Sequence, residues 1–460
     1  MPGSNANLSA LAGRSRRADF AVMAASPVTP LEEYQSLHGV LPGQGLAWLR
    51  DLRDDALRRF SDRGYPSPRD EAWKYTSVAP LLGQTFIPSF SVEPPRKIKP
   101  ADIAACLFAD ADMPLAVFVD GRFDAALSNL SALPPGVELR SLREVLDQDG
   151  ATLETLLGGT VPQEPHGFIE LNTAFMFDGA YVRIAPDAVA ERPLHLLFVA
   201  SGATQPVVSY LRNLVIAARG SRAAVVEHYV SLGDAPSLCN VATQCVIERN
   251  AALDHYKLNE EGAGAYHFSG LYIEQARDSR YTSHNIAAGG RLIRNDLRCV
   301  LAGESAECVL NGLYLGRGRE HIDNQTSVEH RVPHCSSREW YKGVLDGRAR
   351  GVFSGHVMVQ QDAQKTDAQQ MNNNLLLSDE AEVDTRPQLE IYADDVKCSH
   401  GSTVGQLNND VLFYLRARGI GENEARRLLV TAFAQDVVGR MAAEPLREWA
   451  ERLIATRLGR

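Results

Sequence analysis

Hydrophobic residues near the start of the chain recur at helical spacing and predict a helix. The apolar positions are Leu46, Leu49, Leu52, Ala56, Leu57 and Phe60. Gly64 and Pro66 end this pattern, because glycine favours a helix C-terminus and proline cannot continue the helix. An earlier helix is predicted to begin at Pro30, since Thr29 offers an N-cap and Glu32 completes a capping box.

From about residue 166 the pattern changes to short β-like runs separated by Gly, Asn or Asp. They include 194–199, 214–217, 224–229, 242–247, 254–258, 270–273, 297–301, 308–314, 326–329, 351–353, 356–360 and 389–392. No helical periodicity of useful length interrupts residues 210–390. A β region this long without a domain break favours a solenoid over a sandwich or a barrel. In such stacked turns we expect Asn372, Asn373 and Asn374 to form ladders and the leucines after them to fill the interior.

Helical periodicity returns after about residue 408. We therefore divide the chain into a disordered tail over 1–28, a mostly helical domain over 29–165, a β core over 166–405 and a helical domain over 406–460. The tail is rich in Ala, Ser and Arg, so an organelle transit peptide is its alternative interpretation.

Composition excludes several classes of protein. The 460 residues are 45% hydrophobic and 23% charged, as in an ordinary globular protein. A net charge of −10 argues against a nucleic-acid binder, and the apolar runs are too short to span a membrane. The seven cysteines are odd in number and form no CxxC, so we expect a reducing, cytoplasmic setting without disulfides, zinc ribbons or ferredoxin-type clusters.

Several catalytic motifs are missing from the sequence. It contains no GxxxxGK[ST], GxGxxG, GxSxG or HExxH. A self-contained nucleotide hydrolase, kinase, dehydrogenase or serine hydrolase is therefore unsupported. We expect a protein that is not itself an enzyme.

Two polar clusters are open to a structural and a functional interpretation. His330, His334 and Cys335 carry ligand types that suit a borderline metal, but on a strand-turn-strand path the last two point to opposite faces. We favour structural histidines near a turn, with a free-standing metal carrier as the alternative. The run 361–370 is too polar for a strand core, and a solvated rim is its simpler interpretation.

The third cluster, 394–401, carries the most specific candidate site. In an extended chain Cys398 and His400 are two residues apart and share one face. A thiol and an imidazole can share a soft metal or receive sulfur, and Lys397 and His400 could lower the thiol pKa. Two donors cannot complete a tetrahedral site, so a partner has to supply the others. From spacing alone, a buried, inert cysteine beside a hydrogen-bonded histidine fits equally well.

Long runs of this sequence resemble the SufB/SufD family of the SUF iron–sulfur assembly system, and its SufD branch in particular. The runs are 341–347, 362–370, 387–405 and 412–420, with Trp73–Thr76 resembling the N-terminal signature of the family. SufB-like chains carry a His-Glu element where this chain has 398–401. The strong similarity covers about 330–435, and the middle of the chain matches by pattern only.

The resemblance implies a mainly β protein, with a right-handed parallel β-helix flanked by helical terminal domains. It implies a non-catalytic scaffold that pairs with SufB through the β-helix and binds the SufC ATPase through its C-terminal helices. The interface histidine of the family maps onto His400, with Cys398 as its neighbour, so His400 is expected to help hold a transient, nascent iron–sulfur cluster shared with SufB. The expected SufC-binding residues are Leu412, Phe413, Tyr414, Arg416, Arg418 and Arg426.

A carbohydrate-active enzyme is the remaining alternative, because β-helices often carry such sites. A signal peptide and an exposed charged cleft would favour it, and the sequence shows neither clearly.

Overall fold

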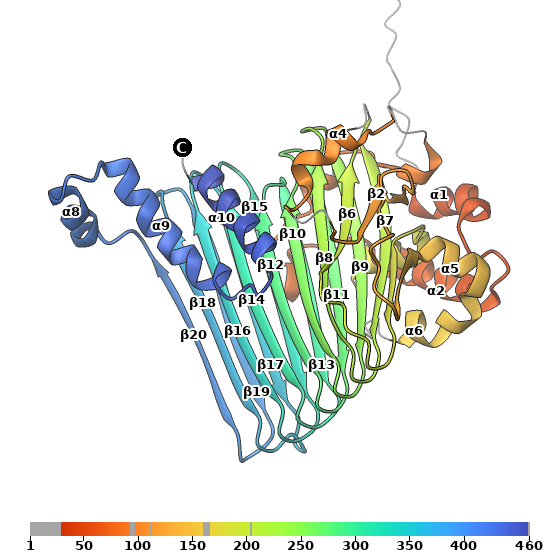
Figure 1. Cartoon of the computed structure of the whole chain (residues 1–460). Helices are drawn as coiled ribbons and strands as arrows, with labels where there is room; N and C mark the ends of the chain where they lie inside the picture. Colours follow the sequence, from red (N-terminus) through yellow and green to blue (C-terminus); the bar gives the residue numbers. More distant parts are fainter. Residues whose placement is uncertain (1–28, 93–96, 110–111, 160–165, 203–204, 459–460) are drawn as a thin grey trace, which may run out of the picture.

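The computed structural model describes residues 29–92, 97–109, 112–159, 166–202 and 205–458. The predicted disordered tail over 1–28 lies outside them. The chain winds into a parallel β-solenoid with helices at both ends, so a mainly β fold is confirmed (Figure 1). Successive strands alternate between two ten-stranded sheets, and each turn adds one strand to each sheet.

The odd sheet contains the odd-numbered strands from β5 to β19, together with β1 and β4. Its strands are β1 (Ile87–Pro88), β4 (Val137–Ser141), β5 (Ala180–Ile184), β7 (Val207–Ala217), β9 (Ser237–Ile247), β11 (Ala265–Gln275), β13 (Leu292–Leu301), β15 (His321–His330), β17 (Arg350–Val359) and β19 (Glu382–Ile391). The even sheet contains the other strands. They are β2 (Leu115–Val119), β3 (Arg122–Phe123), β6 (Leu194–Ala200), β8 (Arg222–Ser231), β10 (Ala252–Glu260), β12 (Arg280–Ala288), β14 (Glu307–Gly316), β16 (Ser336–Leu345), β18 (Asp367–Leu376) and β20 (Lys397–Gly405).

One corner of the solenoid is built from a stack of residues with left-handed backbone. Each of them donates its backbone N–H to a carbonyl oxygen of the next turn. Asp, Asn and Gly tolerate positive φ best, and the stack consists of Asp187, Gly220, Asn250, Asp278, Ser305, His334 and Lys365. The polar residues and glycine between the predicted strands therefore form this corner.

The interior contains polar groups as well as aliphatic ones, and this corrects one prediction. Asn372 and Asn374 are buried inside the solenoid, and Asn374 donates to Asn372 over 2.6 Å. Leu375 instead packs on the outer face of β18, beneath a C-terminal helix. Leu377 packs against the same outer cluster, whereas Leu376 packs against the interior core. The expected interior leucines are thus confirmed only for Leu376, because alternate residues of the strand point outward beneath the helices.

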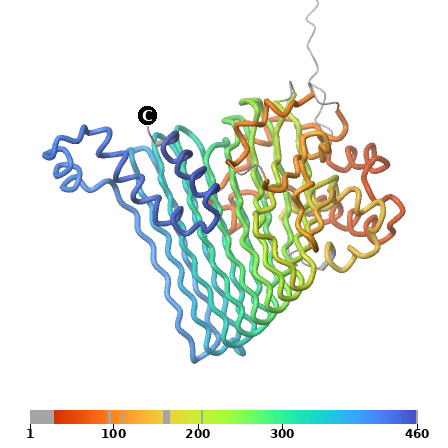
Figure 2. Tube along the Cα trace, viewed as in Figure 1, coloured from red at the N-terminus to blue at the C-terminus, as the bar shows by residue number. Residues whose placement is uncertain are grey.

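Helices cover the outer faces of both sheets, as the ribbon and the tube show (Figures 1 and 2). On the N-terminal side, aromatic residues of α2 and α7 pack against the odd sheet. On the C-terminal side, α9 and α10 pack against the even sheet. The helices are α1 (Pro30–Leu37), α2 (Ala47–Arg63), α3 (Ala79–Leu82), α4 (Pro100–Ile103), α5 (Leu142–Asp149), α6 (Glu154–Gly159), α7 (Gly167–Phe175), α8 (Asn409–Ala417), α9 (Glu422–Val438) and α10 (Glu444–Leu458).

The first predicted helix is confirmed in detail. The Thr29 and Glu32 side chains form a reciprocal capping box before Pro30. The second spans α2, and its C-cap Gly64 has φ +71°. The 29–165 region also contributes strands, because β2 and β4 extend the even and odd sheets at their N-terminal ends.

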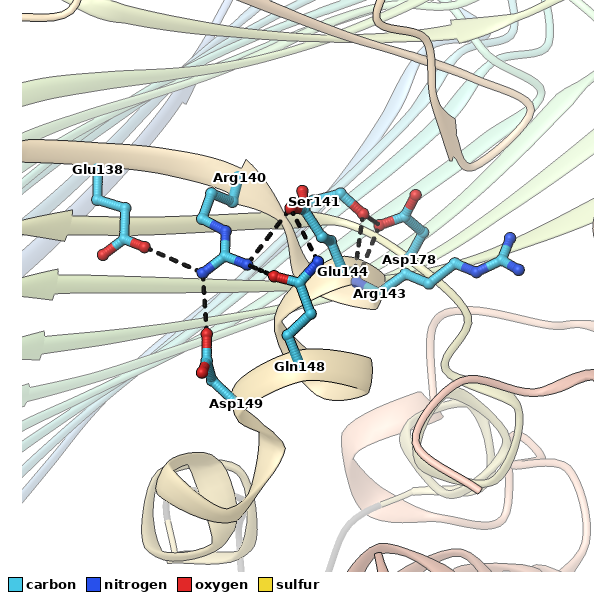
Figure 3. Close-up of polar contacts among 8 residues, drawn as sticks. All are labelled: Glu138, Arg140, Ser141, Arg143, Glu144, Gln148, Asp149 and Asp178. Atoms are coloured by element: carbon cyan, nitrogen blue, oxygen red, sulfur yellow. Dashed lines mark hydrogen bonds and ion pairs between the residues drawn. The ribbon is translucent and has the colours of Figure 1, made fainter. Parts of the chain in front are cut away.

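Polar contacts fasten α5 to the edge of the odd sheet (Figure 3). Arg140, on β4, donates to Gln148 over 2.6 Å and to Asp149 over 3.1 Å. Ser141 caps α5 and donates to the buried Asp178 over 2.7 Å. These contacts anchor α5 on the first turn of the solenoid.

Candidate functional site at the last turn

The solenoid is open at its C-terminal end. Among the strands that the structure describes, β19 pairs only with β17 and β20 only with β18, so each forms the outer edge of its sheet. Nearly all of β20 is exposed. An exposed edge presents unpaired backbone donors and acceptors, which proteins normally cover or pair. This end of the molecule is therefore suited to a partner.

Cys398 and His400 lie on β20, on the face that continues the interior of the solenoid. Cys398 is in register with the buried Ala368, and His400 is in register with the buried Gln370. Cys398 is partly buried against the core, whereas His400 is exposed. The shared face expected from their spacing is thus present, with an exposed imidazole and a partly buried thiol.

Burial raises the pKa of the Cys398 thiol. The expectation that Lys397 and His400 lower this pKa is therefore wrong. The cause is desolvation, which disfavours a thiolate against the core. Of the two side chains, His400 is the better placed to act as a ligand from this chain.

Two buried residues behind His400 were not predicted as part of this site. Glu339 on β16 is in register with Gln370 on β18, so Glu339, Gln370 and His400 form one inward-facing column. Gln370 donates through Nε2 to Glu339 Oε2 over 2.5 Å. The other side-chain oxygen of each residue is buried without a hydrogen-bond partner in the described part of the chain. Because buried polar atoms normally have partners, the column has unused capacity for water or a bound polar group.

The polar run 361–370 is only partly the rim that we expected. Residues from Asp367 onward form the start of β18, and Gln370 is buried. The preceding loop joins the 394–401 stretch, because Lys365 N donates to Asp395 O over 2.7 Å and the two side chains form an ion pair. Two of the three polar clusters in the sequence therefore meet at the open end.

The structure does not bring His330, His334 and Cys335 together as a metal site. His334 is exposed at the left-handed corner, with φ +63°. Cys335 is buried and its thiol lies 3.3 Å from Gly303 O. His330 lies 2.9 Å from Ser337 Oγ, and burial lowers its pKa to about 4. Their interpretation as structural residues near a turn fits this arrangement.

The residues expected to bind SufC lie on the two helices that follow β20. Leu412 is buried, but Phe413 and Tyr414 on α8 are 73% and 54% exposed. The Arg418 guanidinium lies 4.5 Å from the centre of the Tyr414 ring. Glu422 forms ion pairs with Arg416 and Arg426 at 3.4 and 3.5 Å. Figure 1 shows α8 projecting away from the solenoid, so its aromatic side chains form an exposed surface.

Sequence comparison assigns almost the whole described chain to two family domains. The SUF system FeS cluster assembly SufBD core domain matches residues 198–433, and the SufBD protein N-terminal region matches residues 30–196. The chain belongs to the SufBD family of iron–sulfur cluster assembly proteins. The two matches meet at residue 197, within strand β6.

Similar proteins show which branch of the family the chain resembles. The iron–sulfur cluster assembly protein SufD of Escherichia coli is 33% identical over 404 residues, which is 87% of this chain and 91% of that protein. A SufBD family protein of Synechocystis is 30% identical, covering 87% of this chain and 89% of the relative. A chloroplastic protein of Arabidopsis thaliana, ABCI7, is 26% identical over 87% of this chain and 84% of its own length. The chain is thus a SufD homologue. In the part of the chain that the structure describes, no helix has the length and hydropathy needed to cross a membrane.

Proposed function

We propose that this SufD homologue is a non-catalytic scaffold that pairs with SufB at the open end of the solenoid. The observation that carries the proposal is the exposure of His400 on the edge strand β20, next to the buried column of Gln370 and Glu339. In this proposal SufB covers β19 and β20 and supplies the other ligands. The nascent iron–sulfur cluster is the cargo of this shared site, held transiently by His400 with Cys398 beside it.

The C-terminal helices supply the second contact of the proposed scaffold. SufC binds α8 and α9 through the exposed Phe413 and Tyr414 and the arginines 416, 418 and 426, with Leu412 supporting the surface from beneath. ATP hydrolysis then belongs to SufC, because this chain carries no P-loop sequence. A cytoplasmic location agrees with seven cysteines that are all free in the described structure.

Co-expression with SufB and SufC tests the assembly directly. We expect the three proteins to co-purify, and the backbone amides of 397–405 to exchange more slowly with deuterium in the complex than in the isolated chain. The amides of the exposed helix α8 serve as an internal control in a complex that lacks SufC, where their exchange should not change. Unchanged exchange over 397–405 in a complex that contains SufB would remove the open end from the interface.

A further inference from the structure

A second group of metal-ligating side chains lies inside the solenoid, away from the open end. Cys239 on β9 and His267 on β11 are register partners on neighbouring turns. Glu261 reaches them from the turn after β10. One ligand atom of each residue lies within 4.8 Å of the other two. Among the described residues, this is the one group of three His, Cys, Asp or Glu side chains that comes together in this way.

The surrounding residues hold the imidazole and the carboxylate in place. His267 Nε2 lies 3.0 Å from Lys257 Nζ, which also donates to Asn259 and Asn295 over 2.7 and 2.8 Å. Asn259 Nδ2 donates to Glu261 Oε2 over 3.0 Å. His267 Nδ1 lies 2.9 Å from Glu261 Oε2, but the geometry of this pair is not that of a hydrogen bond. Outer partners of this kind orient ligands in metal sites.

Space for a further ligand adjoins the group. A cavity of about 30 Å³ is lined by Cys239 and Glu261, together with Tyr229 and Gly121. That volume holds one or two water molecules. Three protein ligands with one position left for water is the pattern of an open site for zinc or another first-row metal.

We propose that Cys239, Glu261 and His267 bind one divalent transition-metal ion, Zn²⁺ or Fe²⁺, with a cavity water as a fourth ligand. His267 Nδ1 binds the ion, so the ring proton moves to Nε2 and hydrogen-bonds to the neutral amine of Lys257. Cys239 binds as thiolate, and its proton and one from Lys257 are released. The thiolate and the Glu261 carboxylate then neutralise the ion, which satisfies the requirement for charge balance in a buried site.

The inference does not depend on the proposed function, because the site uses none of the residues at the open end. Its consequence is that the chain can hold a metal ion by itself, inside the solenoid and without SufB. Interior metal binding and cluster assembly at β20 can therefore succeed or fail separately.

Titration of the purified full-length chain with Co²⁺, under anaerobic conditions and after chelation, tests the site. We expect one tightly bound Co²⁺ per chain, with a thiolate-to-cobalt absorption band that Zn²⁺ abolishes. Competition of Zn²⁺ against Fe²⁺ then ranks the two candidate ions. Cys239→Ala should remove the absorption band, and Glu261→Gln should weaken binding about 10- to 100-fold.

Cys245→Ala is the matched control, because Cys245 lies buried on the same strand but outside the group. The control should keep the absorption band and the stoichiometry. A metal-dependent rise in Tm, present in wild type and Cys245→Ala but absent in Cys239→Ala, separates loss of binding from loss of folding. An unchanged cobalt spectrum in Cys239→Ala, or wild-type chain that binds no metal, would overturn the proposal.

Discussion

His400 lies in register with Gln370, one strand inward from the open end of the solenoid. Gln370 in turn donates to Glu339, which is fully enclosed in the interior. An exposed imidazole is therefore backed by a buried amide and a buried carboxyl group. This column places a buried carboxyl group two strands behind the surface that we assign to SufB.

The buried carboxyl of Glu339 should make stability depend on pH. Burial raises its pKa to about 7, from an ordinary value of 4.5. The folded chain therefore holds this proton more tightly than the unfolded chain. The bound proton therefore stabilises the folded chain fully below pH 4.5, and this stabilisation is lost as pH rises through 7. The total decrease in the free energy of unfolding is about 3 kcal/mol.

Glu339→Gln removes this titration while keeping the shape of the side chain. Between pH 5 and pH 8, we expect the free energy of unfolding of wild type to fall relative to the variant by about 2 to 3 kcal/mol. Urea denaturation at both pH values measures the difference. Glu380→Gln, an exposed partner of Arg348, is the control and should show no such change. A wild-type to Glu339→Gln difference that is independent of pH would contradict the assignment.

Arg294 should hold the N-terminal segment to the solenoid. It is buried and donates to Asp323 over 2.6 Å, to Asp296 over 2.8 Å and to Ala72 O over 2.9 Å, with Trp73 stacked 3.8 Å from its guanidinium. Arg294→Met leaves buried carboxylates without their cation, so we expect a loss of about 3 to 5 kcal/mol in the free energy of unfolding.

Arg298→Met is the control for Arg294→Met. Arg298 is partly exposed, and its partner Glu329 retains an ion pair with Arg331, so the loss should stay within about 1 kcal/mol. Chemical denaturation of both variants provides the measurement. If both variants lost the same free energy of unfolding, the buried ion pairs of Arg294 would contribute no more to stability than the pair formed by Arg298.

Phe413 should contribute to SufC binding without contributing to folding. Its side chain is 73% exposed on α8, so Phe413→Ala should change the free energy of unfolding by less than about 0.5 kcal/mol. A central aromatic residue of an interface is typically worth about 2 kcal/mol or more, so Kd for SufC should rise about 30-fold. Calorimetric titration with SufC measures this. Val189→Ala is the control, because Val189 is an exposed apolar residue outside α8, and this change should leave Kd unchanged. An unchanged Kd in Phe413→Ala would show that SufC does not bind through Phe413.

An element could be predicted from the sequence where its local residue pattern matches the burial that those residues have in the folded protein. Thr29, Pro30 and Glu32 carry the whole signal of the first helix cap, and it forms as expected. The predicted pieces 351–353 and 356–360 are one strand, β17. The strands β12 and β16 are absent from the predicted runs, because their inward positions include polar residues such as Asn285 and Glu339. A search for apolar alternation cannot find a strand whose buried face is polar.

The repeat of the solenoid was also hidden, because its turns differ in length. The same register position on successive strands of the even sheet is occupied by Ala252, Arg280, Glu307, Ser336, Asp367 and Lys397. The intervals between these positions are unequal, so no fixed sequence period aligns them. The shared face of Cys398 and His400 followed from a spacing of two residues within one strand. The column behind His400 could not be found, because it depends on register between turns.

Anaerobic cluster reconstitution on the purified complex with SufB and SufC tests the central claim most directly. The comparison is between wild type, His400→Ala and Ser402→Ala, since Ser402 lies two residues further along the same face of β20. We predict that all three complexes assemble, that Ser402→Ala loads iron and sulfide as wild type does, and that His400→Ala loads at least several-fold less. Wild-type loading in an intact His400→Ala complex would contradict the account.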